Sequence, residues 1–418
     1  MKVGIFEKAL TVPLFTELYG YGPFLGRRCR GTRDSLFCRA LTFFDGNKRI
    51  VLVVTDAVVT DDADARALRA IISAKHGIAP EGVFFAGTHT HSGPAMSLGI
   101  GWGEMNQEYL EHWRNTVMEV VAEAIASEEE IRAYAGIAPL TQKIGKNRVE
   151  ENGPTDTGIR WIQFKRADGT VKALLHNHGM HGVVFGSKML FVSADWMGEA
   201  NRLIKERGMA ETPFFLYGAA GNVNADPVGG GETHLLRIGK SYVDDLEAGV
   251  KAGGRELNLW PLSSALEAVV LPTVHEDAAQ MLENARILAP SFLSSRFEEM
   301  AILAEQGRSF EVKPDLQVLR IGDIAIYAFP GEPFCELGKW IMDESSAPFP
   351  MAAGVANGNC RYFPIQATFD KFKDGIASTN RGYGFYEIYQ GAGRFMPRYQ
   401  PDIARFVVDK LLAMDPLV

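Results

Sequence analysis

Two groups of histidines carry the clearest chemical signal in the sequence. His89 and His91 form a His-x-His pair in segment 83–94, where a β-type run ends in Gly-Thr and a Gly-Pro turn follows. In an extended chain, residues i and i+2 point to the same side, so both rings can reach one site. Imidazole is a common metal ligand, and the pair therefore indicates either a metal site or two turn histidines that bond to the backbone.

A second group, His176, His178 and His181, follows a hydrophobic run, and structural roles can account for two of the three. Glu332 lies between two prolines at the end of an apolar strand, where an ordinary surface glutamate has no particular reason to lie. A carboxylate from this place would complete a His/His/Glu set with one coordination position open for water. That arrangement is typical of a catalytic zinc site.

Three stretches of the same layout would position these residues. Each has a β-type run, a turn containing glycine and aspartate, and a second β-type run with a polar residue just beyond it, which predicts a hairpin. The paired runs are 37–44 with 49–55, 159–164 with 171–175, and 316–320 with 324–329. The similarity is one of layout and not a repeat of sequence.

Apolar residues recur with a helical period in several further segments. These segments are 62–75, 107–127, 198–208, 235–251, 277–306 and 401–414. Strands and helices alternate along the chain, which predicts an α/β fold with mixed β-sheets inside and helices outside. No linker or low-complexity tract divides the chain. We therefore expect residues 1–418 to form one catalytic domain, with a weak candidate joint at 253–262.

Composition excludes several classes of protein. The 418 residues are 46% hydrophobic and 22% charged, as in soluble globular proteins. Lys and Arg number 43 against 51 Asp and Glu, a net charge of −8 without any basic stripe, so nucleic acid is not an expected partner. The sequence has neither a transmembrane segment nor a recognisable signal peptide, which predicts a cytoplasmic protein. The four cysteines form no Cys-x-x-Cys pair, which disfavours a thiolate zinc site.

Short motifs occur along nearly the whole chain in an order known from one enzyme family. They are Gly-Thr-His-Thr-His-Ser-Gly-Pro at 87–94, Asn147-Arg148, Met180-His181-Gly182, Ser193-Ala194-Asp195-Trp196, the stretch 218–224, and Pro330-Gly331-Glu332. The first and last of these together make a specific signal. In these motifs the sequence resembles the neutral/alkaline (non-lysosomal) ceramidases. The resemblance implies the fold of a ceramidase catalytic domain and a Zn²⁺-dependent amidase.

The resemblance also implies a set of metal ligands, two histidines, a glutamate and a tyrosine. His89 and His181 match the two histidine ligands, and Glu332 matches the carboxylate ligand. Tyr362, in Arg-Tyr-Phe-Pro, is our choice for the tyrosine ligand, and the tyrosines at 383, 386 and 389 compete with it. These residues would hold Zn²⁺.

Further site residues follow from the same resemblance. His91 would be the electrophile that stabilises a developing oxyanion, and Arg148 would contact the polar head of the substrate. One of the tyrosines at 383, 386 and 389, with Tyr383 and Tyr386 as the main candidates, would be a second oxyanion donor.

The sequence departs from the family pattern at Asn224. Where the family has Gly-Asp-Val-Ser, with the serine counted in the catalytic site, this chain has Gly-Asn-Val-Asn at 221–224. An asparagine cannot act as the nucleophile. The chain is also expected to lack the signal peptide and the C-terminal β-sandwich domain of the secreted ceramidases.

The resulting expectation is a zinc-dependent hydrolase that cleaves an amide or ester bond of a small or amphipathic substrate through a metal-activated water. A second enzyme class stays open, namely a metal-dependent lyase, isomerase or glycoside-directed enzyme, because Arg148 and the asparagines at 222 and 224 suit a sugar-like polar ligand. A third alternative is a catalytically inactive binding protein on the same fold. A homo-oligomer is compatible with each of them.

Overall fold

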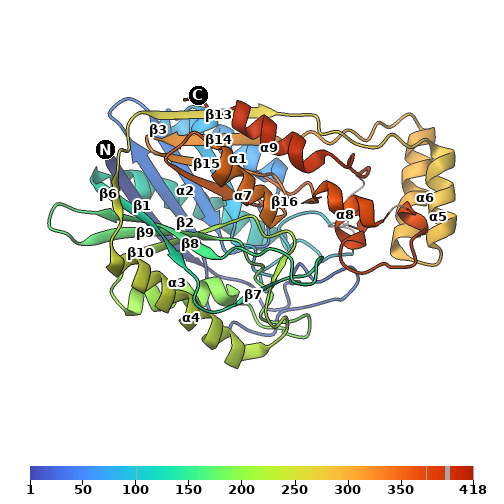
Figure 1. The fold of residues 1–418 in the computed structure, drawn as a ribbon, viewed down its shortest axis with the longest axis horizontal. Helices are drawn as coiled ribbons and strands as arrows, with labels where there is room; N and C mark the ends of the chain where they lie inside the picture. The colour runs from blue at the N-terminus through green and yellow to red at the C-terminus, as the bar shows by residue number, and fades with distance from the viewer. Residues whose placement is uncertain (100, 373, 391–395, 418) are drawn as a thin grey trace.

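Three mixed β-sheets form the centre of the structure, and helices cover them (Figure 1). The computed structural model describes residues 1–99, 101–372, 374–390 and 396–417. The first sheet, in spatial order, consists of β4 (Val83–Gly87), β3 (Arg49–Thr55), β2 (Leu36–Phe44), β1 (Lys2–Leu10) and β5 (Glu129–Glu130). Only β3 and β4 run parallel in this sheet.

The second and third sheets are built in the same way. The second consists of β10 (Thr212–Tyr217), β9 (Val171–His178), β8 (Gly158–Lys165), β6 (Arg132–Pro139) and β12 (Arg255–Leu257). The third consists of β13 (Leu262–Ala268), β14 (Asp315–Ile321), β15 (Ile324–Ala328) and β17 (Phe349–Ala353). Two small ribbons pair β7 (Gly145–Asn147) with β11 (Val223–Ala225) and β16 (Glu332–Pro333) with β18 (Tyr362–Phe363).

One unit recurs in all three large sheets, an antiparallel hairpin followed by a helix and a strand parallel to the second hairpin strand. The units are β2-β3-α1-β4, β8-β9-α3-β10 and β14-β15-α7-β17. The three hairpins expected from the sequence are therefore confirmed. A crossover helix follows each hairpin because parallel neighbours cannot be joined by a tight turn. The repeated layout thus sends the carboxyl ends of each parallel pair, β3/β4, β9/β10 and β15/β17, to the same edge of its sheet.

Helices lie outside the sheets, as the alternation of elements predicts. They are α1 (Asp62–His76), α2 (Gln107–Ala126), α3 (Asp195–Glu206), α4 (Gly231–Ala252), α5 (Ala278–Leu288), α6 (Phe292–Glu305), α7 (Cys335–Glu344), α8 (Gln366–Lys371) and α9 (Ile403–Ala413), with short turns η1 (Pro80–Gly82) and η2 (Gly375–Ala377) and the π-helix η3 (Tyr386–Gln390). None of the helices formed by the described residues has the length and apolarity that a membrane crossing requires.

The segment 277–306 differs from its expected form of one long helix. It forms α5 and α6, which lie side by side at one end of the molecule (Figure 1). Pro290 has no N–H to continue α5, and the Ser291 hydroxyl accepts a hydrogen bond from Ser294 N at 3.2 Å, which starts a new helix.

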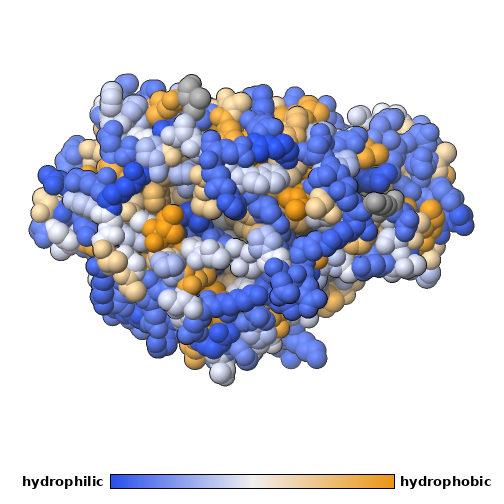
Figure 2. Space-filling model, viewed as in Figure 1, coloured by the Kyte–Doolittle hydropathy of each residue, from blue (hydrophilic) through white to orange (hydrophobic). Residues whose placement is uncertain are grey.

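One apolar core is shared by the three sheets. It contains Leu52 and Phe84 of the first sheet, Leu175 of the second, and Ile326 and Met351 of the third, all buried. The opposite face of each sheet packs against its own helices. By contrast, the outer face seen in Figure 2 is mostly hydrophilic, with apolar residues in small scattered areas. The shared core holds the three sheets together, and it thereby fixes the relative positions of their strand ends.

The stretch 253–262, expected as a candidate joint, connects two of the sheets. Its first part is β12, which pairs with β6 in the second sheet, and it ends at Leu262, where β13 begins to pair with β14 in the third.

Candidate metal centre

The histidine and glutamate candidates follow the carboxyl ends of strands in three different sheets. His89 comes two residues after β4, His181 three residues after β9, and Glu332 four residues after β15. In α/β proteins, ligands commonly bind beyond the carboxyl ends of parallel strands. Each sheet therefore delivers one candidate residue to the same place.

His89, His91 and His181 form a buried cluster. One ring nitrogen of each lies within 4.8 Å of one ring nitrogen of the others. The ring centroid of His89 is 4.9 Å from that of His91 and 4.6 Å from that of His181. All three residues are buried, and His181 is fully so. The three rings together could hold a metal ion.

The hydrogen bonds of the cluster fix which ring nitrogen faces its centre. Nδ1 of His89 lies 2.8 Å from the carbonyl oxygen of Val58, and Nδ1 of His181 lies 3.0 Å from that of Val223. A carbonyl can only accept, so each Nδ1 carries a proton, and Nε2 of each ring is the nitrogen that faces the centre of the cluster. Histidine ligands of metals commonly donate their other ring N–H to a carbonyl in this way.

The convergence of His89 and His91 has a different backbone basis from the extended chain that the spacing suggests. His89 has a φ of 66°, in the left-handed region, so the chain turns sharply after β4. Such a conformation is costly for a residue with a side chain and is found at functional sites that the surrounding structure holds in place. His89 N donates to Ala57 O at 2.8 Å and His91 N to Gly182 O at 3.0 Å, which fixes the turn.

Glu332 faces two of the three histidines. Its Oε2 atom lies 3.3 Å from Nε2 of His89 and 3.1 Å from Nε2 of His181. Burial alone would raise the pKa of Glu332, but the neighbouring imidazoles of His89 and His181 outweigh burial and hold that pKa well below its usual range. The carboxylate is therefore ionised and adds negative charge at the cluster.

Tyr362 lies beside Glu332 in the small ribbon of β16 and β18. The two residues are direct partners in this parallel pair, so both side chains leave the ribbon on the same side. Burial, followed by the neighbouring Glu332 charge, raises the pKa of Tyr362 well above its ordinary value. The structure thus brings the four expected ligands, His89, His181, Glu332 and Tyr362, together, and it adds His91 to the histidine cluster.

Arg148 lies at the edge of the cluster. Its Nε donates to Glu387 at 2.8 Å and its Nη1 to Asn224 Oδ1 at 3.1 Å, and Nη1 is 3.4 Å from Nε2 of His181. Three tyrosine rings surround its guanidinium, those of Tyr362 at 5.2 Å, Tyr383 at 5.0 Å and Tyr386 at 5.9 Å. The expected site residues Asn224, Tyr383 and Tyr386 therefore lie around Arg148 at the edge of the histidine cluster.

Tyr383 and Tyr386 occupy different environments at this edge. Tyr383 is half exposed. The ring of Tyr386, on η3, packs 5.7 Å from that of Tyr362, and burial raises the pKa of Tyr386 above its usual value. Tyr389 instead packs on Phe385, with ring centroids 4.5 Å apart.

The two asparagines of segment 221–224 have separate roles. Asn222 donates from Nδ2 to Glu336 at 2.8 Å and accepts from Cys335 N at 2.8 Å, which ties the segment to the start of α7. Asn224 instead faces Arg148, and its Oδ1 is occupied by the guanidinium.

His176 and His178 are engaged in structural hydrogen bonds. His176 lies between Tyr242 Oη at 3.0 Å and Asn201 Oδ1 at 2.8 Å. His178 Nδ1 lies 3.1 Å from Gly158 O. The sequence allows structural roles for two of these three histidines, and His181 alone belongs to the metal cluster.

Two residues of the site were not foreseen from the sequence. The ring of Tyr217, at the end of β10, stacks on His89 at 4.6 Å, and its hydroxyl lies 3.3 Å from Nδ1 of His181. Glu387 forms the ion pair that holds Arg148. Neither lies in a motif. The one available signal was that β10 ends in an aromatic residue, and the helical periodicity gave no indication of η3.

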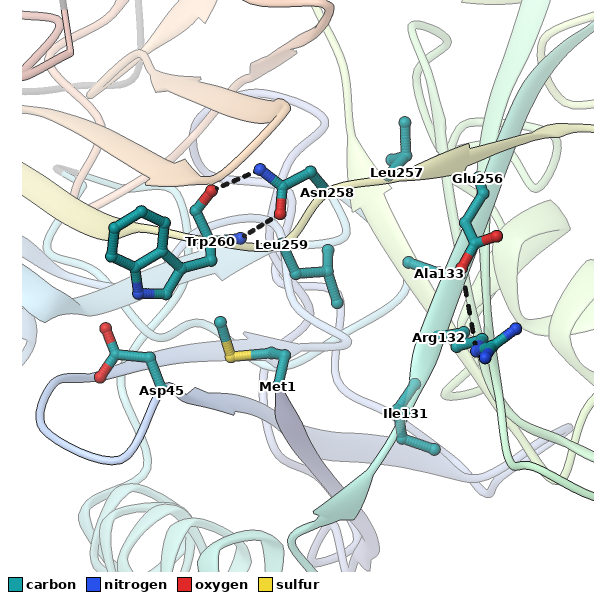
Figure 3. A pocket seen from close by; sticks show the side chains of 10 residues that line it. All are labelled: Met1, Asp45, Ile131, Arg132, Ala133, Glu256, Leu257, Asn258, Leu259 and Trp260. Atoms are coloured by element: carbon teal, nitrogen blue, oxygen red, sulfur yellow. Dashed lines mark hydrogen bonds and ion pairs between the residues drawn. The ribbon is translucent and has the colours of Figure 1, made fainter.

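Two cavities near the strand ends differ in their relation to the cluster. One of about 760 Å³ is lined by Tyr21, Phe185, Met189 and Val228, and the Tyr21 ring packs 5.2 Å from that of His91. Another, of about 450 Å³, lies at the amino-terminal end of β3 between Met1 and Trp260, and none of the candidate residues lines it (Figure 3). None of the candidate residues lines the first cavity either, but Tyr21 in its wall packs on the histidine cluster.

Comparison with known proteins identifies the fold. The neutral ceramidase from Pseudomonas aeruginosa aligns with a TM-score of 0.77 and 15% sequence identity, over 99% of this chain and 73% of that chain. A second solved structure, a ceramidase complexed with C2, gives a TM-score of 0.77 and 15% identity over 99% of this chain and 74% of that chain. No protein-family model and no curated protein matches the sequence. The chain therefore has a neutral ceramidase-like fold, as the motifs imply.

Proposed function

We propose that the protein is a zinc-dependent hydrolase that cleaves an amide, or an ester, in a small or amphipathic substrate. The observation that carries the proposal is the buried cluster of His89, His91 and His181, with the ionised Glu332 beside two of its rings. The neutral ceramidase-like fold supports the assignment, because the two solved structures to which the chain is similar are ceramidases.

The donor set fits a zinc ion. Nε2 of His89 is buried and makes no hydrogen bond, which is costly for a polar atom unless a bound group occupies that position. Neutral imidazoles and a carboxylate suit zinc, whereas a magnesium or calcium site would consist of oxygen ligands. We propose that His89, His181, Glu332 and Tyr362 hold the metal. When bound, zinc would polarise the scissile carbonyl and make water more acidic.

His91 is suited to accept a proton. Its Nδ1 lies 2.8 Å from Gly20 O and therefore carries a proton. Burial, together with the neighbouring His89 and His181, lowers the pKa of His91 well below its ordinary value, so the ring is neutral and Nε2 has a free lone pair. We propose that Nε2 takes a proton from the attacking water as negative charge develops on the substrate, because that charge offsets the burial that makes the free ring a weak base. The resulting imidazolium then becomes the donor that stabilises the oxyanion and can pass its proton to the leaving amine.

Arg148, Asn224 and the tyrosines would bind the substrate. The Arg148 guanidinium is held by Glu387 and Asn224, so it has one fixed orientation beside the cluster. A preorganised donor of this kind typically contributes a few kcal/mol (about 2.7 to 4) to transition-state stabilisation. The Tyr386 hydroxyl keeps its proton at neutral pH because burial raises its pKa, and Tyr383 is half exposed at the same edge. Either hydroxyl can donate to the substrate carbonyl.

We infer the size of the substrate from the cavity whose wall contains Tyr21, the ring that packs on His91. A volume of about 760 Å³ lies within the range of about 300–1,000 Å³ typical of small-molecule sites. Phe185, Met189 and Val228 give it apolar walls, while Lys188 and Glu232 lie among its other lining residues. An amphipathic molecule fits this lining better than a fully polar one. The sugar-directed alternative is weakened further because both groups of the Asn222 amide are already bonded, to Glu336 and Cys335.

The proposal is tested by metal analysis and substrate profiling of the purified protein. We expect one zinc per chain and hydrolysis of short N-acyl amides or esters that stops on chelation and returns with zinc. His91→Ala should keep the metal and lose turnover. Loss of the metal in His91→Ala would make His91 a ligand instead. A zinc-loaded protein inert towards all amides and esters would refute the hydrolase assignment.

A further inference from the structure

Arg27 is a buried cation directly behind His91. It is 4% exposed, and its guanidinium donates to four main-chain carbonyls. Nη1 donates to Tyr19 O at 3.2 Å and to His91 O at 3.0 Å, Nε to Ser187 O at 3.0 Å, and Nη2 to Met189 O at 3.1 Å. One side chain therefore joins three separate segments of the chain.

This guanidinium is buried without a carboxylate partner. Within the described parts of the chain, no aspartate or glutamate forms an ion pair with Arg27. Burial lowers its pKa to about 10, and the nearby Tyr21 offsets this only in part. Burying an unpaired charge is costly, and carbonyl dipoles and the Tyr21 ring, 4.6 Å from Cζ, are what compensate it here. An apolar residue at position 27 would avoid the cost of burying a charge. We therefore expect the hydrogen bonds that the guanidinium donates to the four carbonyls to be what this position requires.

The segments joined by Arg27 are those that orient His91. The Gly20 carbonyl, which accepts from His91 Nδ1, immediately follows the Tyr19 carbonyl that Arg27 holds. Gly20 has a φ of 113°, and a Cβ atom there would lie 2.5 Å from His91 Nδ1, so the backbone approaches the ring as closely as a glycine allows. Arg27 thus donates hydrogen bonds on both sides of this contact, to the carbonyl of His91 and to that of Tyr19, the residue before Gly20.

We propose that Arg27 is a positioning residue for His91. By holding the carbonyls of Tyr19 and His91 on one rigid guanidinium, it keeps the Gly20 carbonyl against Nδ1. This contact fixes the tautomer and turns Nε2 towards the metal cluster. The consequence for turnover rests on the proposed hydrolase function, whereas the tautomer itself does not.

The first test is spectroscopic and needs no substrate. In protein labelled with ¹⁵N-histidine, the His91 signals are assigned by their loss in His91→Ala. We expect wild type to show one neutral tautomer with the proton on Nδ1, and Arg27→Met to show a mixture of tautomers. The matched control is Arg320→Met, which also removes a buried arginine, one that pairs with Asp415 in the third sheet. That control should keep the wild-type His91 spectrum.

The second test separates turnover from binding. Because a misplaced catalytic group can cost about a hundredfold in rate, we expect kcat of Arg27→Met to fall by about 10- to 100-fold, while KM and zinc content stay within about threefold of wild type. Arg27→Lys keeps the charge but offers three donors to four carbonyls, so it should recover only part of kcat. If Arg27→Met does not fold, Arg27→Lys takes its place in both tests.

Two results would overturn the inference. One is an Arg27 variant that melts like Arg320→Met but keeps the wild-type tautomer and kcat. The other is full recovery by Arg27→Lys, which would make charge rather than geometry the contribution. If the wild type hydrolyses no amide or ester, the proposed function fails, and the His91 spectrum still decides the role of Arg27.

Discussion

Replacing Glu332 with glutamine tests the proposed metal set most directly, because the change keeps the shape of the side chain and removes its charge. In the structure, Oε2 lies 3.3 Å from His89 Nε2 and 3.1 Å from His181 Nε2. Loss of a partner one shell further out already costs about 10- to 100-fold in metal affinity at typical sites. Loss of a charged ligand should therefore lower zinc affinity by at least about a hundredfold, or about 3 kcal/mol.

The metal-free protein tests the charge of Glu332 separately from the metal. The pKa of Glu332 is held well below its usual range, so the folded state favours the ionised carboxylate more than the unfolded state does. Glu332→Gln removes that charge. Without metal, the variant should therefore melt at a lower temperature than wild type at pH 7.

A zinc titration followed by thermal melting measures both effects. Zinc that binds only the folded protein raises the melting temperature in proportion to the logarithm of its concentration over Kd. We expect a clear rise for wild type and a much smaller one for Glu332→Gln. Glu336→Gln is the matched control, because Glu336 is a partly buried carboxylate four residues further along that bonds to Asn222. Equal zinc affinity in wild type and Glu332→Gln would refute the assignment of Glu332 as a ligand.

Three more results are expected. Asn224→Ser shortens the side chain whose oxygen accepts a hydrogen bond from Arg148 at 3.1 Å, so kcat/KM on short acyl amides should fall by about tenfold. The wild-type protein should have only weak activity on long-chain ceramide. Strong wild-type ceramidase activity would contradict the preference for small substrates. Val228→Trp narrows the cavity beside His91 and should reduce hydrolysis of long acyl chains more than short ones, whereas Val270→Trp, equally exposed but remote from that cavity, should change neither. Burial raises the pKa of Asp195 from 3.8 to about 7, so the folded state binds this proton more strongly than the unfolded state, and the free energy of unfolding should fall as pH rises from about 4 through 7. Urea unfolding of Asp195→Asn should show a smaller fall over this pH range. Equal pH dependence in wild type and Asp195→Asn would contradict this prediction.

Much of the fold could be predicted because hairpins leave a local signal. The turn at Asp45 illustrates this: its carboxylate accepts from the backbone of Asn47 at 2.9 Å and of Lys48 at 2.7 Å, and Gly46 adopts a φ of 100° that other residues avoid. Alternating runs on either side then fix the strands. What the local pattern cannot give is which sheets share a core, because that depends on contacts between distant segments.

In the candidate site, likewise, residues in local motifs could be predicted and residues placed by distant contacts could not. His89, His181 and Glu332 stand at strand ends in recognisable motifs, so their meeting could be expected. Tyr217 and Arg27 could not be found, because their contributions come from a stacked ring and from four main-chain carbonyls rather than from a motif. The resemblance implies that His91 is an electrophile, and no motif contains the contact between its Nδ1 and the Gly20 carbonyl on which the proposed proton transfer rests.

Because of the repeated unit, binding of the proposed metal would depend on the packing of all three sheets. Each large sheet contributes one residue beyond a strand end, His89 from the first, His181 from the second and Glu332 from the third. None of the sheets alone holds more than one of these three ligands. The site therefore exists only when the sheets are packed on their shared core, and a metal bound there would join all three. Because such a metal stabilises the folded chain alone, its binding energy is added to the packing of the core, and a chain with a weakened core should depend more strongly on the metal to stay folded.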